Sequence, residues 1–299
     1  MLPRRRLHVL SGALSAHFTS AAPAPVLREL HVADDPSAWR AAGFCVDSAG
    51  VSRVGSVAVR LLGATGAGGR RGIVGWGLSE VAAVTTTIDG IPCWRVDDTA
   101  AAGGAGGGGG AGTECHQQQH PNGSAAVDHV VLRSDDWRRT DGALLAQGLV
   151  CRRRRDDIYP GITQLFYRDG GPIIELVAPT VGVAGEEDGG RKGAEGGEAV
   201  VMGQKKAKAA AAAAAALAVF GLGQGGAERG CAVWGLTLAV GDLDASKALL
   251  GEAASTVRSA KQPGRRIMTL RNRQLDISVN VAFISDHVAG AVPPVPSNL

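Results

Sequence analysis

The chain has 299 residues, of which 45% are hydrophobic, enough for one large or two modest domains. Its 31 basic and 28 acidic residues give a formal charge of +3, so overall charge offers no argument for a nucleic acid or an anionic membrane as partner. Five cysteines without CxxC spacing favour free thiols in a reducing compartment.

Residues 1–27 are expected to be a targeting or disordered N-terminus. The first 28 residues contain four arginines and several serines but no Asp or Glu, a composition typical of a transit peptide. A chloroplast or mitochondrial location is therefore expected, with the cytoplasm as the alternative. A secretory signal is less favoured because His8 and His17 interrupt the apolar run.

Residues 28–98 are predicted to form a shortened βαβββ-like module. ELHVA is typical of a strand, Asp35 is placed to cap a helix with Pro36 at its first position, and Gly43 is expected to end that helix. FCVD, SVAVRLLG and GIVGWGLS follow as predicted strands. A Gly-rich linker is expected at 99–119.

Residues 120–180 contain the clearest pattern. Within them, Val127 to Pro179 predicts a strand, a helix that opens at Asp135 or Asp136 and ends at Gly148, and three further strands, which is a βαβββ unit. The helix face formed by Trp137, Leu144 and Leu145 is expected to lie against the sheet.

Two polar residues interrupt otherwise apolar strands of this module. Because side chains alternate along a strand, His129, Val131 and Arg133 share one face, and so do Ile173, Glu175 and Val177. If the apolar face of each strand meets the helix, His129 and Glu175 point away from it. A histidine and a carboxylate in that position could bind a metal.

Residues 181–230 are a low-complexity insertion, residues 231–286 a further module, and 287–299 a tail. Within 231–286, Asp242 to Leu250 is predicted to be a helix. The alanine-rich run in the insertion is too short to span a bilayer. Because they lack periodic apolar faces, 1–27, 100–112 and 181–230 are predicted to be dispensable for folding.

The order of a strand with a central His, a helix, and three strands ending in one with a central Glu resembles the vicinal oxygen chelate superfamily, which includes glyoxalases, bleomycin-resistance proteins and extradiol dioxygenases. HPNG at 120–123 and QPGRRIMTLR at 262–271 are similar to stretches of glyoxalase-like-domain proteins. The resemblance implies an α+β fold of paired βαβββ modules, with curved mixed sheets enclosing a cleft and helices outside. It leaves two arrangements open for the first module. That module packs beside the other two, or it pairs with a degenerate half within Gly75 to Asp98.

The resemblance also implies a small organic ligand in the cleft between modules. One hypothesis is a metal-dependent lyase, isomerase or dioxygenase with Fe, Mn, Zn, Ni or Mg, in which His129 and Glu175 are metal ligands and Glu175 is catalytic. The alternative is a metal-free binding protein like the bleomycin-resistance members, or a scaffold with a degenerate cleft. Arg133, Gln164 and Phe166 are the expected ligand contacts. A homodimer is allowed, and neither a nucleic acid nor a membrane is an expected partner.

The metal hypothesis is supported by only half of a site. At the position in the last module that corresponds to His129 stands Gly235 or Thr237, and near the position that corresponds to Glu175 stands Ser278 or Asn280. A buried hydrogen-bonded pair of His129 and Glu175, or Glu175 alone binding a polar group of a ligand, is therefore an equal alternative.

Two other clusters have simpler explanations than ligand binding. Arg152 to Arg155 could bind an anion, but charges on an edge strand also prevent edge-to-edge pairing. Cys115, His116 and His120 could be metal ligands, but they adjoin a Gly tract and a glutamine run typical of a solvated loop.

Overall fold

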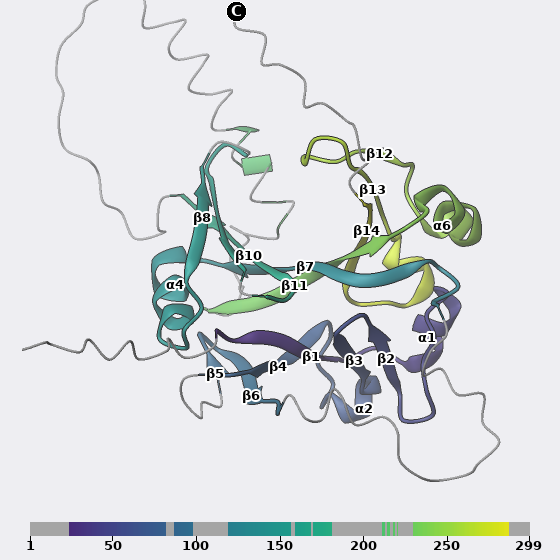
Figure 1. Ribbon diagram of the computed structural model, residues 1–299, viewed down its shortest axis with the longest axis horizontal. Helices are drawn as coiled ribbons and strands as arrows, with labels where there is room; N and C mark the ends of the chain where they lie inside the picture. The colour runs from purple at the N-terminus through teal and green to yellow at the C-terminus, as the bar shows by residue number, and fades with distance from the viewer. Residues whose placement is uncertain are drawn as a thin grey trace, which may run out of the picture.

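The computed structural model describes residues 24–81, 87–97, 119–156, 159–168, 170–180 and 230–286, with 211, 212, 214, 215, 218 and 220. In this part the chain has the predicted α+β fold, with two mixed sheets lying one above the other (Figure 1). None of the helices in the described ranges is long and apolar enough to cross a membrane.

The smaller sheet has six strands in the order β2-β3-β1-β4-β6-β5. β1 lies parallel to β3 and antiparallel to β4, and β4 lies parallel to β6. The strands β4, β6 and β5 extend the sheet of the first module, and this sheet also packs on the sheet formed by the other two modules, so the chain has features of both arrangements left open. The elements are β1 Val26–Val32, α1 Pro36–Ala41, β2 Val51–Val54, β3 Val57–Leu61, α2 Gly63–Gly66, β4 Ile73–Ser79, β5 Thr87–Ile88 and β6 Ile91–Arg95.

The first helix begins and ends as predicted, but the strand expected after it is absent. Asp35 caps α1 by accepting from the backbone N–H of Ser37, and Gly43 ends the helix with φ +76°. FCVD, residues 44–47, is no strand because its donors find other partners. The N–H of Cys45 donates to the ring of His120 at 3.0 Å. β2 starts four residues later, at Val51.

The larger sheet has eight strands in the order β12-β13-β14-β11-β7-β10-β9-β8. The central module and the last module join through the antiparallel pair β7 and β11. The elements are β7 Ser124–Ser134, α4 Trp137–Leu145, β8 Cys151–Arg155, β9 Ile162–Tyr167, β10 Ile173–Pro179, β11 Cys231–Val240, α6 Leu243–Leu250, η1 Gly251–Ala253, β12 Arg258–Ser259, β13 Arg266–Thr269, η2 Asn272–Leu275 and β14 Asn280–Ser285.

One main apolar core is shared by the two sheets. It includes Leu30 and Trp76 from the six-stranded sheet and Leu132 and Leu236 from the eight-stranded sheet. We call the face of the eight-stranded sheet that points away from this core its outer face. In Figure 1 this sheet curves, so that β8 at one end and β12 and β13 at the other rise above β7 and β11.

The helix α4 is rotated relative to the prediction from its apolar residues. Asp136 caps it as expected, and Leu144 is fully buried, but Leu145 is 55% exposed. Thr140 is buried instead, because residues spaced by three and four positions line one helix face while adjacent residues diverge by about 100°. The prediction that Leu145 packs on the sheet was wrong.

The HPNG stretch joins the first module to the start of β7. The side chain of Asn122 is fully buried and donates from Nδ2 to Ala42 O at 2.9 Å. His120 accepts the N–H of Cys45 at Nδ1, so its Nε2–H donates to Arg53 O at 2.9 Å. This histidine therefore holds two modules together, which is the physical role that sequence alone did not supply.

His120 should make stability depend on pH. Burial lowers its pKa, although the bond to Arg53 O acts in the opposite direction. A histidine whose pKa falls on folding stabilises the protein above the unfolded pKa of about 6.5, and that stability is lost as pH falls from there. We expect this group to lower the free energy of unfolding by up to ~1.4 kcal/mol for each pH unit below that value. His120→Gln should show a shallower dependence of the free energy of unfolding on pH. Urea denaturation at several pH values between neutral and mildly acidic measures this, and equal slopes would contradict it.

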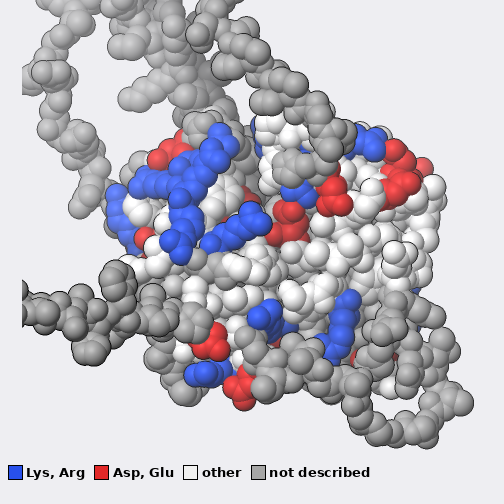
Figure 2. Space-filling model, viewed as in Figure 1, with Lys and Arg blue, Asp and Glu red and all other residues white. Residues whose placement is uncertain are grey.

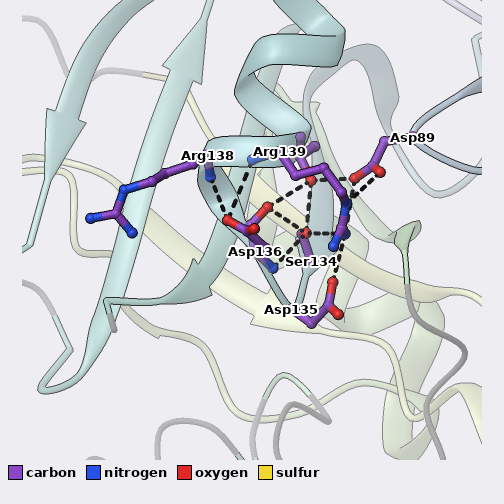
Figure 3. Close-up of polar contacts among 7 residues, drawn as sticks. Asp89, Ser134, Asp135, Asp136, Arg138 and Arg139 are labelled. Atoms are coloured by element: carbon purple, nitrogen blue, oxygen red, sulfur yellow. Dashed lines mark hydrogen bonds and ion pairs between the residues drawn. The ribbon is translucent and has the colours of Figure 1, made fainter. Parts of the chain in front are cut away.

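A second junction between the sheets centres on Asp89, in the β5–β6 turn (Figure 3). The guanidinium of Arg139 donates to Asp89 Oδ1 at 2.7 Å and Oδ2 at 3.2 Å, and the hydroxyl of Thr140 also donates to Asp89. Arg139 also reaches Asp135 at 2.6 Å. The first turns of α4 are thereby fixed to the six-stranded sheet.

Candidate functional site

The strand register places the predicted site residues on the outer face of the eight-stranded sheet. In the parallel pair of β7 and β10, His129 lies opposite Ile173, and Val131 lies opposite Glu175. On β9, Phe166 lies opposite Glu175 and Gln164 opposite Val177, which in turn faces Arg133. Directly paired residues point to the same side, so the predicted site residues share this face. Those residues are His129, Arg133, Gln164, Phe166 and Glu175.

At the centre of this face, four side chains form a continuous polar chain. Asp128 Oδ2 lies 2.7 Å from His129 Nδ1, and His129 Nε2 lies 3.8 Å from Glu175 Oε2. Gln164 Nε2 donates to Glu175 Oε1 at 2.5 Å. His129 and Glu175 therefore lie on adjacent strands within reach of a common point.

Asp128 reaches this face because β7 is irregular at that position. The register of β7 against β11 shifts between His129 and Val127, so that Asp128 and the next residue both contact groups on the outer side. Arg265 fixes Asp128 from the last module, with Nη1 at 2.7 Å from Asp128 Oδ1. Arg265 also donates to Ser285 O and to Gln262 Oε1, both at 2.6 Å. The QPGRRIMTLR stretch thus anchors the site across the module boundary.

The pKa values of Glu175 and Asp128, the two carboxyl groups among these four side chains, shift in opposite directions. Burial raises the pKa of Glu175, although His129 and the hydrogen bond from Gln164 act against that rise. Burial also opposes ionisation of Asp128, but the hydrogen bonds from His129 and Arg265 outweigh it and lower the Asp128 pKa. Asp128 is therefore the fixed anion that holds His129 Nδ1–H, which leaves Nε2 facing Glu175.

The side-chain amide of Gln164 has one buried polar atom without a hydrogen-bond partner in the described part of the chain. Its Nε2 is committed to Glu175, and its Oε1 is buried without a hydrogen-bond partner in the described part of the chain. The whole residue is 7% exposed. A buried acceptor of this kind costs free energy unless a donor reaches it, so a ligand group that donates a hydrogen bond would be stabilised here.

The described residues do not complete a metal centre of the expected kind. His129 Nε2 and Glu175 Oε2 are two ligands, but the position opposite His129 on β11 is Thr237, and Asn280 on β14 donates to Trp234 O. No group of three or more His, Cys, Asp or Glu side chains that could hold an ion occurs among the described residues. The donor set therefore does not fit a three-ligand site.

A small apolar cluster covers the part of the outer face next to these polar groups. It contains Val131, Ile162, Val177 and Phe220, with Tyr159 and Trp234 packed against them. Burial and the nearby Glu175 carboxylate raise the pKa of Tyr159, with Arg258 acting in the opposite direction. The polar and apolar halves of the outer face thus adjoin each other.

The four arginines of β8 lie on the edge strand, as expected. Arg153 lies opposite Phe166 and Arg155 opposite Gln164, which places both on the outer side, while Arg154 stacks on Trp137 of α4 at 4.2 Å. Figure 2 shows Lys and Arg side chains gathered over this end of the sheet. The position supports the edge-protecting interpretation of Arg152 to Arg155.

Sequence reasoning identified some members of this site and missed others. Asp128 and Arg265 were missed because a strand irregularity and a contact between modules leave no periodic signal. Phe220 was missed because it lies in a segment without apolar periodicity. Of the alternative metal ligands, His120 is held by backbone groups, whereas Cys115 and His116 lie outside the described residues.

With its paired βαβββ modules and an outward-facing His–Glu pair, the chain has the vicinal oxygen chelate fold that its sequence resembles. A triply substituted 4-hydroxymandelate synthase from Streptomyces coelicolor matches 90% of this chain and 94% of its own, with 12% identity and a TM-score of 0.50.

Methylmalonyl-CoA epimerase from Mycobacterium tuberculosis matches over 57% of this chain and 93% of its own, with 18% identity and a TM-score of 0.34. The Streptomyces coelicolor epimerase in complex with 2-nitronate-propionyl-CoA matches over 57% and 99%, with 18% identity and a TM-score of 0.33. No family model and no curated protein sequence matches the chain. At 12% identity, the match with 4-hydroxymandelate synthase shows the fold alone.

Proposed function

We propose that the outer face of the eight-stranded sheet binds a small organic molecule and that Glu175 transfers a proton to or from it. The observation that carries this proposal is a largely buried carboxyl group with a raised pKa, which lies beside a histidine whose other nitrogen is held by an ionised aspartate. A carboxyl group whose pKa moves toward neutrality is suited to general acid–base catalysis. The reaction class this supports is an isomerisation or a lyase step.

The geometry gives each group a distinct role. Gln164 holds Glu175 Oε1, so Oε2 is the oxygen that faces His129 across 3.8 Å. A ligand atom between them could contact both, because two hydrogen bonds of about 2.8 Å span that gap in a bent arrangement. Glu175 would accept a proton from the ligand and return it. His129, whose proton lies on the Nδ1 that binds Asp128, would orient the ligand by accepting a hydrogen bond at Nε2. A donor on the ligand would satisfy Gln164 Oε1.

A metal-free binding protein is the second candidate. It is favoured by one observation, that the facing strands of the last module supply Thr237 and Asn280 rather than further charged ligands. In that case Glu175, Gln164 and Arg133 would bind the ligand's polar groups and no bond would change.

The test begins with thermal-shift screening of small hydroxy- and oxo-carboxylic acids, with and without Mg²⁺, Mn²⁺, Fe²⁺, Ni²⁺ and Zn²⁺. Compounds that stabilise the wild type are then incubated in D₂O, and exchange of their carbon-bound protons is followed by NMR. We expect exchange in the wild type and a loss of roughly 100-fold or more in Glu175→Gln. Arg266→Ala, which alters an exposed arginine, should behave as wild type.

Each other outcome contradicts part of the proposal. Binding without exchange in the wild type supports the metal-free binding protein, and full exchange in Glu175→Gln removes Glu175 as the proton-transfer group. A stoichiometric metal that the wild type retains, and that both His129→Ala and Glu175→Ala lose, would establish a metal site in place of this arrangement.

A further inference from the structure

Phe220 lies on the outer face of the eight-stranded sheet although it belongs to the 181–230 insertion. It is only 8% exposed. Its ring meets Tyr159 edge-on at 5.7 Å and tilts against Trp234 at 5.4 Å between ring centroids. The backbone of Phe220 is also held, because Arg133 Nη1 donates to its carbonyl oxygen at 3.4 Å.

This packing is separate from the main core. Phe220, Val131, Ile162 and Val177 form their own cluster, whereas the residues between the two sheets form another. The opposite sides of β7 and β10 contribute Leu132 and Leu176 to that main core. Phe220 therefore covers a surface that the fold does not need to bury in order to join its two sheets.

Phe220 also adjoins the proton-transfer residue. Val131 is the direct cross-strand neighbour of Glu175, and Val177 follows Glu175 by two positions on the same face. Both valines belong to the cluster that Phe220 completes. The space beside Glu175 in which an apolar part of a ligand would lie is thus taken by a side chain of the protein.

We propose that Phe220 determines ligand specificity by filling the apolar half of the outer face. This inference rests on the proposed function, namely that the polar half binds a ligand at Glu175. The ligand is then a small, polar compound without a bulky ring or long alkyl chain. Ring-bearing compounds bind only when Phe220 is displaced or removed.

The experiment uses the dye anilinonaphthalene sulfonate, a ring-bearing probe that fluoresces in apolar surroundings, with the full-length protein. Removing the ring of Phe220 uncovers Val131, Val177, Tyr159 and Trp234. We expect Phe220→Ala to increase dye fluorescence roughly five-fold or more over wild type while unfolding stays cooperative. Phe220→Leu, which keeps an apolar side chain in place, should increase the dye fluorescence much less.

Leu145→Ala is the matched control, because Leu145 is an exposed apolar residue on α4 and leaves the arginines that could attract the dye unchanged. It should bind dye as wild type does. Equal fluorescence in wild type and Phe220→Ala would overturn the inference. Loss of cooperative unfolding in Phe220→Ala would also overturn it, since Phe220 would then be a core residue. Neither result depends on Glu175→Gln, so failure of the proposed function is distinguished from failure of this inference.

Discussion

Arg265→Ala is expected to lower the free energy of unfolding by about 3–5 kcal/mol, because it removes a buried guanidinium and leaves the partly buried Asp128 carboxylate without its cationic partner. The guanidinium is 6% exposed and also bonds Ser285 O and Gln262, so the substitution removes three contacts together. Loss of Arg265 should also raise the pKa of Asp128 and loosen its hold on His129. Urea denaturation followed by circular dichroism measures the change in stability.

Arg266 provides the control for this prediction at the next position. Its side chain is 48% exposed and its ion pair with Asp244 lies at 2.8 Å on the surface. Exposed ion pairs contribute between zero and about 1 kcal/mol, so Arg266→Ala should unfold within about 1 kcal/mol of wild type. Similar losses for the two substitutions would show that the Arg265 network does not stabilise the fold beyond a surface pair.

Asp89→Asn is expected to lower the free energy of unfolding by about 2–3 kcal/mol, because Arg139 and Thr140 lose a charged acceptor that joins the two sheets. Asparagine is chosen because residue 89 has φ +45°, a left-handed conformation that asparagine adopts more easily than alanine. The variant therefore removes the negative charge of residue 89 without disturbing the backbone of the β5–β6 turn.

Asp97→Asn is the matched control for Asp89. Asp97 is 80% exposed, and its oxygen lies 3.8 Å from Arg95. We expect a change below about 0.5 kcal/mol. Differential scanning calorimetry of both variants gives the comparison, and an unchanged melting temperature for Asp89→Asn would show that the charge of Asp89 does not stabilise the junction between the sheets.

The sequence was sufficient to predict what depends on local periodicity and capping. Asp35, Asp136 and Asp242 each cap a helix as expected, and the alternation of His129 with its apolar neighbours predicted the face on which it lies. Those signals are carried by residues within one turn or one strand.

What could not be predicted depends on contacts between distant segments. Asp128 turns toward the site because β7 shifts register there, and Arg265 reaches it from more than a hundred positions away. FCVD alternates like a strand but lacks a strand partner, since the ring of His120 binds the N–H of Cys45 instead.

The long connection between β10 and β11 has a thermodynamic consequence. These strands flank β7 in one sheet, yet residues 180–230 separate them along the chain. The entropy lost on closing a flexible loop grows only with the logarithm of its length, so lengthening a connection from about 6 to about 50 residues costs roughly 2 kcal/mol. That is comparable to one ordinary substitution, which explains how the fold tolerates such an insertion. A long separation along the chain also slows the pairing of β11 with β7 during folding. The insertion should therefore lower the folding rate more than the stability.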